Sequence, residues 1–135
     1  MERIALDTSF LIDLQNERRP RGPNRGALRF LRARPEARLV LPSVALGEYL
    51  EGFEDPHSDE AQALVGGLDV LDVTREVAAL FASVARSLRA SGRLIGTNDL
   101  WIACTARAAD VPIATRNVEH FERVAGLEVV GYAAA

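Results

Sequence analysis

Short apolar segments alternate with helical segments along the whole chain, and this alternation limits the possible folds more than any other feature. Strand-like segments are expected at residues 3–6, 38–41, 68–73, 111–115 and 127–132. Strands separated by helices form βαβ units, whose strands run parallel because each crossover returns the chain to the same end of the sheet. The sequence therefore predicts an α/β fold, a three-layer α/β/α sandwich with a mostly parallel central sheet.

Helices are expected between these strands, at residues 9–16, 27–34, 42–53, 61–65, 75–90, 98–109 and 118–124. The clearest is the helix over 75–90, whose apolar residues recur at helical spacing and form one stripe. The helix over 98–109 has almost no polar face, which predicts that it is buried. Trp101 in this helix is expected to belong to the core.

The composition is that of an ordinary globular domain, with 48% hydrophobic and 26% charged residues. No repeat or linker is visible, so residues 1–135 are expected to form a single domain. Apolar runs are far shorter than the roughly 20 residues of a membrane helix, and a strand begins at Arg3, so neither an anchor nor a signal peptide is expected. Cys104 is the only cysteine, which excludes an intrachain disulfide and favours the cytoplasm.

Charge is distributed unevenly, although the net charge of −3 argues against a generally basic nucleic-acid-binding protein. The segment 18–38 holds eight arginines and one acid, whereas the segment 48–76 holds nine acids and one base. All sixteen basic residues are arginine. The arginines either follow RNA phosphates or form solvated helix faces, and the sequence leaves both interpretations open.

Two aspartates occupy similar places in this pattern. Asp7 directly follows the first strand, and Asp99 stands at the start of the apolar helix over 98–109. Ligands of open α/β sheets bind outside the carboxyl ends of the strands, although Asp is also a common helix N-cap. A carboxylate at the mouth of a buried helix needs a partner, and a cation would provide one.

Glu48 is a third, weaker candidate. On the helix over 42–53, Leu46, Leu50 and Phe53 are expected to face the core, and Glu48 projects nearly opposite them. A solvated glutamate is therefore the default interpretation.

Four segments together resemble the PIN-domain ribonucleases, specifically the VapC toxins of bacterial toxin–antitoxin pairs. In order, they read ALDTSFLIDL, LPSVALGEYLEG, GTNDLWIACTA and PIATRNVEHFERVAGLEV. The resemblance implies a metal-dependent endoribonuclease with an acidic site at Asp7, Glu48 and Asp99, and with Ser9 near the metal. It further implies Mg²⁺ or Mn²⁺ as cofactor, RNA as substrate, a homodimer, and inhibition by a small antitoxin protein.

The chain departs from the family pattern after the fourth strand. Many members carry an acid in a T-x-D segment, but here Thr115 and Arg116 are followed by Asn117. Asn117 still offers a carbonyl oxygen but adds no charge. His120 stands where some relatives have a further acid, so the site holds either one or two metals. Both His120 and His57 are expected at the surface, because no Cys or His stands at zinc spacing with them.

The residue types fit metal-dependent hydrolysis independently of the family. Mg²⁺ takes oxygen ligands and is typically held by one or two carboxylates, which suits Asp7 and Asp99 as metal ligands. Glu48 would contact the metal through water or orient the attacking water. Because like charges repel, at least one of these carboxyl groups should have a raised pKa when no metal is bound.

Other enzymes that start from a strand-end Asp are excluded. A dehalogenase-type phosphatase would have a second Asp at the position of Ser9 and a lysine partner, and a receiver domain would also need a lysine, which the chain lacks. A P-loop nucleotidase is excluded because no GK[ST] motif is present. The remaining alternative is a catalytically weak PIN-like module that binds RNA or a protein partner without turnover, which Asn117 and His120 motivate.

The acidic stretch over 48–60 predicts a docking site for the antitoxin. Together with an anionic cleft, it would attract a basic antitoxin segment, whose arginine could occupy the metal position.

Overall fold

A computed structural model describes residues 2–133 of the chain and contains one five-stranded sheet. The strands are β1 (Arg3–Leu6), β2 (Arg38–Pro42), β3 (Asp69–Leu71), β4 (Ile113–Thr115) and β5 (Val129–Gly131). Their order in the sheet is β3-β2-β1-β4-β5, and every neighbouring pair is parallel. The parallel sheet expected from the sequence is confirmed.

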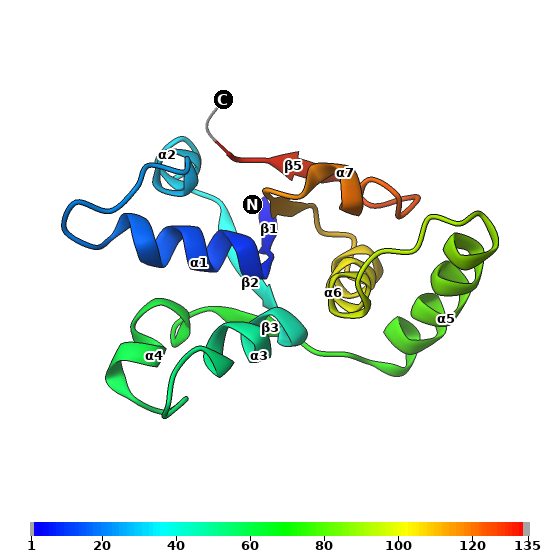
Figure 1. Ribbon diagram of the computed structural model, residues 1–135, viewed down its shortest axis with the longest axis horizontal. Helices are drawn as coiled ribbons and strands as arrows, with labels where there is room; N and C mark the ends of the chain where they lie inside the picture. Colours follow the sequence, from blue (N-terminus) through cyan, green and yellow to red (C-terminus); the bar gives the residue numbers. More distant parts are fainter. Residues whose placement is uncertain (1, 134–135) are drawn as a thin grey trace.

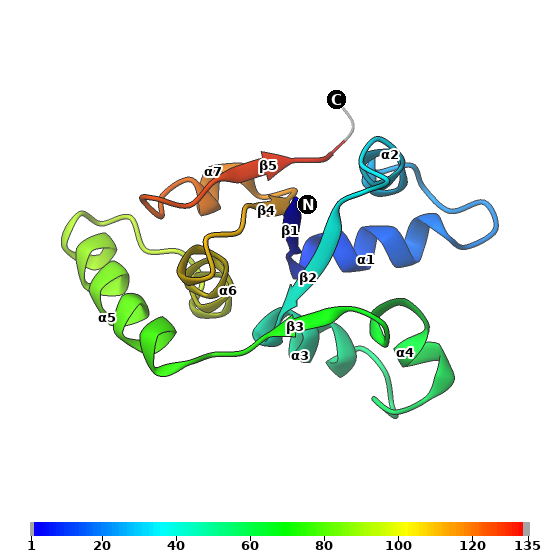
Figure 2. The same ribbon diagram turned by 180° about the vertical axis from the view of Figure 1, so that it is seen from behind.

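The helices connect these strands and cover both faces of the sheet (Figures 1 and 2). They are α1 (Thr8–Glu17), α2 (Ala27–Arg32), α3 (Ser43–Glu51), α4 (Asp59–Val65), α5 (Arg75–Ala90), α6 (Thr97–Ala108) and α7 (Val118–Phe121). From β1 to β3 the chain moves toward one edge of the sheet, and from β3 it crosses back to β4 and β5. Because such crossovers are right-handed, α1 to α4 lie on one face and α5 to α7 on the other. The three-layer sandwich is therefore confirmed.

The expected elements are all present, with differences at their ends. Helix α4 begins two residues earlier than expected, because the Ser58 side chain accepts a hydrogen bond from the Ala61 amide and caps the helix. Strands β3 and β5 are shorter than expected, and neither contains a fully buried residue. Among residues 2–133, none of the helices combines the length and apolarity that crossing a membrane requires.

Helix α6 is the buried helix that its composition predicts. Its residues Leu100 and 102–106 are buried, and α5 packs against its outer side, away from the sheet (Figure 1). The rings of Phe81 on α5 and Trp101 on α6 are stacked, with centroids 3.7 Å apart. Trp101 is therefore a packing residue, as expected, although it is only partly buried.

The expected core face of α3 packs against the core but is not its most buried face. Ala45 and Tyr49 are the buried residues of this helix, whereas Leu46, Leu50 and Phe53 are only partly buried. The reason is that α3 contacts α1 on one side and α6 on the other, in addition to β2. Different sides of α3 therefore pack against different neighbours. As a result, more of the helix surface is buried than a single apolar stripe predicts.

Candidate active site

The candidate site lies at the carboxyl edge of the sheet, where β1 and β4 run side by side. Asp7 directly follows β1, and Thr115 is the last residue of β4. The register, with Leu6 opposite Ala114, brings these two residues together. The amino-terminal ends of α1 and α6 lie at the same edge, and their partial positive charge favours anions there.

Asp7 is almost fully buried, with 2% of its surface exposed. Its carboxylate caps α1 by accepting a 2.9 Å hydrogen bond from the Phe10 amide. It also accepts hydrogen bonds from the hydroxyls of Ser9, at 2.8 Å, and Thr115, at 2.5 Å. The Asp7 carboxylate therefore caps α1 and also stands at the end of strand β1. Donors from α1 and β4 fix its orientation.

Glu48 is half-buried and points toward the same edge, so the interpretation as a solvated glutamate is wrong. One carboxylate oxygen accepts a 2.7 Å hydrogen bond from the Thr8 hydroxyl, and the other accepts a 3.1 Å bond from the Asn98 side-chain amide. These donors stand at the starts of α1 and α6. Glu48 therefore bridges the two helix starts that carry the aspartates.

Asp99 completes the group in the first turn of α6. Burial raises its pKa, the negative charge of Glu48 raises it further, and His120 acts in the opposite direction. Burial also raises the pKa of Asp7, with a contribution from the Asp99 charge, although the hydrogen bonds to its carboxylate oppose the shift. Two of the three carboxyl groups thus have raised pKa values, as expected, but burial is the larger cause and repulsion between the acids only adds to it.

The comparisons with known proteins agree with this geometry. The sequence profile of the PIN domain matches residues 4–127. The ribonuclease VapC1 of Haemophilus influenzae is 30% identical over 128 residues, which cover 91% of this chain and 92% of the relative. The chain belongs to the PIN-domain family, with VapC ribonucleases as its relatives. This confirms the resemblance that the four sequence segments indicate.

Two further VapC proteins are similar to this chain, one in sequence and one in structure. The tRNA(fMet)-specific endonuclease VapC of Shigella flexneri is 32% identical over 97 residues, covering 68% of this chain and 74% of that protein. The solved structure of VapBC-1 from nontypeable Haemophilus influenzae superposes with a TM-score of 0.77 at 28% identity. That superposition covers 96% of this chain and 98% of the other.

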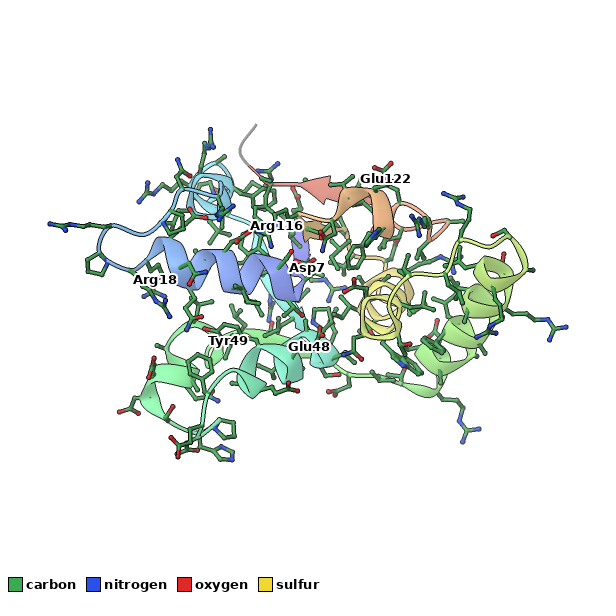
Figure 3. All side chains as sticks on the ribbon, in the orientation of Figure 1. Asp7, Arg18, Glu48, Tyr49, Arg116 and Glu122 are labelled. Carbon is green, nitrogen blue, oxygen red and sulfur yellow. The ribbon has the colours of Figure 1, made fainter. Side chains whose placement is uncertain are left out.

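The donor set of this PIN domain fits a hard divalent cation. Glu48 and Asp99 line an open hollow together with residues 96–98, and the Thr8 hydroxyl and the Asn98 side-chain N–H donate to Glu48. Within residues 2–133, no group of three Asp, Glu, His or Cys side chains is arranged so that it could hold a metal ion. Mg²⁺ does not require such a group, because it usually keeps several waters and takes one or two carboxylates. Figure 3 shows Asp7 at the start of α1 and Glu48 on α3, both in the central part of the molecule.

The residues that depart from the family pattern lie at the rim. Asn117 is exposed and donates its backbone N–H to the Thr115 hydroxyl at 2.9 Å, so it supports the residue that bonds Asp7. His120 is exposed, as expected, and it acts to lower the pKa of Asp99. His57 is also exposed.

Sequence reasoning missed the residues that hold the acids in place. The side chains of Thr8, Asn98 and Thr115 each donate to one of the acids from a different part of the chain. It also missed a buried group beside the site, in which Asp13 bonds Arg116 and Tyr132. Thr8 and Asn98 adjoin candidate acids in the sequence, which is a usable signal. The partners of Asp13 lie more than a hundred residues away and carry no local pattern.

Proposed function

We propose that this protein is a divalent-metal-dependent endoribonuclease that acts as the toxin of a toxin–antitoxin pair. The observation that carries the proposal is the placement of Asp7, Glu48 and Asp99, three acids from separate segments, at the carboxyl edge of the sheet, where Thr115 donates to Asp7 and Thr8 and Asn98 donate to Glu48. The names of the relatives, ribonuclease VapC1 and tRNA(fMet)-specific endonuclease VapC, support an RNA substrate.

Asp7 and Asp99 are the proposed metal ligands, for Mg²⁺ or Mn²⁺. Their raised pKa values reflect buried or partly buried like charges, which a cation would relieve. When bound, the cation supplies a positive charge that polarises the phosphodiester and acidifies a water molecule. Ser9 supports the site because its hydroxyl contacts both carboxylate oxygens of Asp7, at 2.8 and 3.0 Å.

Glu48 is proposed to orient the attacking water. Thr8 and Asn98 each donate to one of its oxygens, which holds the carboxylate in one direction and leaves lone pairs free. A positioned carboxylate can accept the proton of a water as it attacks phosphorus. Asn117 lies at the rim of the site and supports Asp7 indirectly. Its backbone N–H donates to the Thr115 hydroxyl, which donates to Asp7.

A cleavage assay tests this function. Protein purified free of any co-expressed partner should cut single-stranded RNA in Mg²⁺ or Mn²⁺, and Asp7→Asn and Asp99→Asn should lower the rate at least about 100-fold. Asp110→Asn, a change at the opposite edge of the sheet, serves as control. If the wild-type protein binds RNA equally well but cuts none in either metal, the alternative of a binding module without turnover replaces the proposal.

An antitoxin is the proposed protein partner, docking on the acidic stretch over 48–60. Glu51 and Glu54 are exposed next to the site, which suits a basic segment. Glu51→Lys should weaken binding of the small protein encoded beside this gene at least about 10-fold, whereas the exposed Glu36→Lys should not. Unchanged affinity of the Glu51 variant would remove this stretch as the docking surface.

The remaining expectations are a homodimer, a single PIN-like domain over 1–135 and a cytoplasmic location without membrane association. The free, buried Cys104 is compatible with a reducing compartment.

A further inference from the structure

A buried ionic group lies beside the three acids and has no part in the mechanism described so far. Its centre is Asp13 on α1, which is only 3% exposed. An ionised carboxylate at such a position is costly unless it is paired and hydrogen-bonded. Both of its oxygens have donors, and these donors come from the residues that directly follow β4 and β5.

The first donor is Tyr132, whose hydroxyl bonds Asp13 at 2.5 Å. Tyr132 is buried, and its ring packs edge-on against Phe10, with centroids 4.6 Å apart. Burial, together with the neighbouring Asp13, raises the pKa of this tyrosine well above its usual value, so it remains a neutral donor. The Asp13 carboxylate is therefore held in one orientation by a rigid partner.

The second donor is Arg116, whose Nη1 bonds the other oxygen of Asp13 at 3.0 Å. Unlike Asp13 and Tyr132, the Arg116 side chain is 41% exposed. Among the described residues, Asp13 is the one hydrogen-bond acceptor of this guanidinium. A guanidinium has five N–H donors in a planar fork, so a second edge remains available to a ligand.

Arg116 is close to the candidate metal site. It follows Thr115, which bonds Asp7, and its own backbone N–H lies 3.4 Å from the Ser9 hydroxyl. Asp13 is four residues after Ser9 on α1, so the guanidinium is held about one helical turn, about 5 to 6 Å, along that helix. Figure 3 draws Arg116 and Asp7 in the same central region.

We propose that Arg116 binds a backbone phosphate of the RNA next to the one that is cut, and that Asp13 and Tyr132 position its guanidinium for this contact. The proposal rests on the ribonuclease function proposed above. An arginine that is pinned along one edge by a carboxylate loses little further freedom when its other edge binds a phosphate.

Steady-state kinetics on a short single-stranded RNA test the proposal. Arg116→Gln should raise KM about 10-fold and leave kcat within about twofold, because the contact is made before and during the reaction. The slope of log KM against log salt should fall by about 0.7, the value for one phosphate contact on a single strand. Asp13→Asn, which keeps Arg116 but frees it, should raise KM about threefold.

Two controls separate substrate binding from structure. Arg38→Gln removes another exposed arginine paired with an aspartate, at the opposite edge of the sheet, and should leave both KM and the salt slope unchanged. The double variant Asp13→Asn/Arg116→Gln leaves no unpaired buried charge and should have the KM of Arg116→Gln. A lower thermal midpoint for Arg116→Gln with wild-type KM and salt slope would overturn the proposal and make the ion pair purely structural.

RNA binding provides a readout that does not depend on cleavage. In an Asp99→Asn background with Mg²⁺ present, fluorescence anisotropy should show about 10-fold weaker RNA binding after Arg116→Gln. If the wild-type protein cuts no RNA, the proposed activity fails, yet this measurement still decides the role of Arg116. Equal affinity with and without Arg116 overturns it.

Discussion

At the scale of single residues, Asp7 combines two tasks that the sequence presents as alternatives. Its carboxylate caps α1 through the Phe10 amide and also stands at the strand-end site, where the charge of Asp99 contributes to its raised pKa. A buried acid that is fixed by several donors is a well-oriented ligand, because little freedom remains to be lost on binding. Removing it would disturb both the helix and the site, which makes Asp99 the better residue for separating stability from activity.

Asp99→Asn should stabilise the metal-free protein at neutral pH while it abolishes cleavage. The substitution removes a partly buried charge that faces Glu48, and both features raise the pKa of Asp99. We expect the thermal midpoint in EDTA to rise by about 1 to 4 °C, which differential scanning calorimetry measures. A lower midpoint would mean that the Asp99 carboxylate is stabilised rather than strained by its surroundings.

The raised pKa of Asp99 determines whether the stability of the metal-free protein rises or falls with pH. A carboxyl group whose folded-state pKa is raised binds its proton more tightly in the folded protein than in the unfolded chain. Its stabilising contribution is present below the ordinary value of 3.8 and is lost as the pH rises through the raised pKa. The metal-free wild-type protein should therefore lose this contribution as the pH rises above about 4, and Asp99→Asn should lose less. Parallel pH curves for the two proteins would contradict this.

Glu48→Gln should lower kcat at least about 100-fold while binding of RNA changes little, since a neutral amide cannot accept the proton of an attacking water. The Thr8 hydroxyl can still donate to the amide oxygen, so the side chain should stay in place. Single-turnover cleavage at saturating enzyme measures the effect. A matched control is Glu51→Gln on the same helix, which is exposed and should cut at the wild-type rate.

At the scale of elements, helix α2 depends on a cap from outside itself. Its N-cap is Gly26, which offers no side chain, and the Glu17 carboxylate at the end of α1 instead accepts from the Ala27 and Leu28 amides at 2.9 and 3.2 Å. The free amides of a helix start need such acceptors, and an acidic one also suits the helix dipole. Glu17 thereby holds together the two ends of the arginine-containing loop over 18–26, which connects α1 and α2.

Glu17→Gln should destabilise the protein by about 1 to 2 kcal/mol, because one charge-assisted pair of hydrogen bonds is weakened. The midpoint of urea unfolding reports the change, with an unchanged dependence on denaturant. Glu36→Gln, an exposed acid in the turn before β2, is the control and should leave the midpoint unaltered. Cleavage of RNA should be unaffected by either change, and loss of activity in Glu17→Gln would instead connect this segment to the site.

Periodicity predicted most elements but did not identify the most buried residues of α3, Ala45 and Tyr49. For α5, which packs on one neighbour, the stripe expected from the sequence includes the buried Val77 and Leu88. For α3, which contacts α1, α6 and β2, a single stripe does not describe the packing, and Glu48 is half-buried for that reason. The family resemblance, rather than the helical pattern, placed Glu48 in the candidate site.

At the scale of the whole molecule, the alternation of strands and helices predicted a parallel sheet but not the order of its strands. That order places β4 beside β1 and so brings Thr115 to Asp7. Contacts of this kind join residues about a hundred positions apart, and a single sequence holds no local pattern for them. The bonds from Arg116 and Tyr132 to Asp13 escaped prediction for the same reason.

Titration of Mn²⁺ into the partner-free protein by calorimetry tests the central claim most directly. We expect the wild type and the control Asp110→Asn to bind the ion equally. Asp110 lies at the opposite edge of the sheet, and its left-handed backbone conformation is one that Asn tolerates. Asp99→Asn should bind at least about 10-fold more weakly, and wild-type affinity should fall as the pH is lowered toward the raised pKa values of Asp7 and Asp99. Equal Mn²⁺ affinity for wild type and Asp99→Asn would contradict a cation site built from these acids.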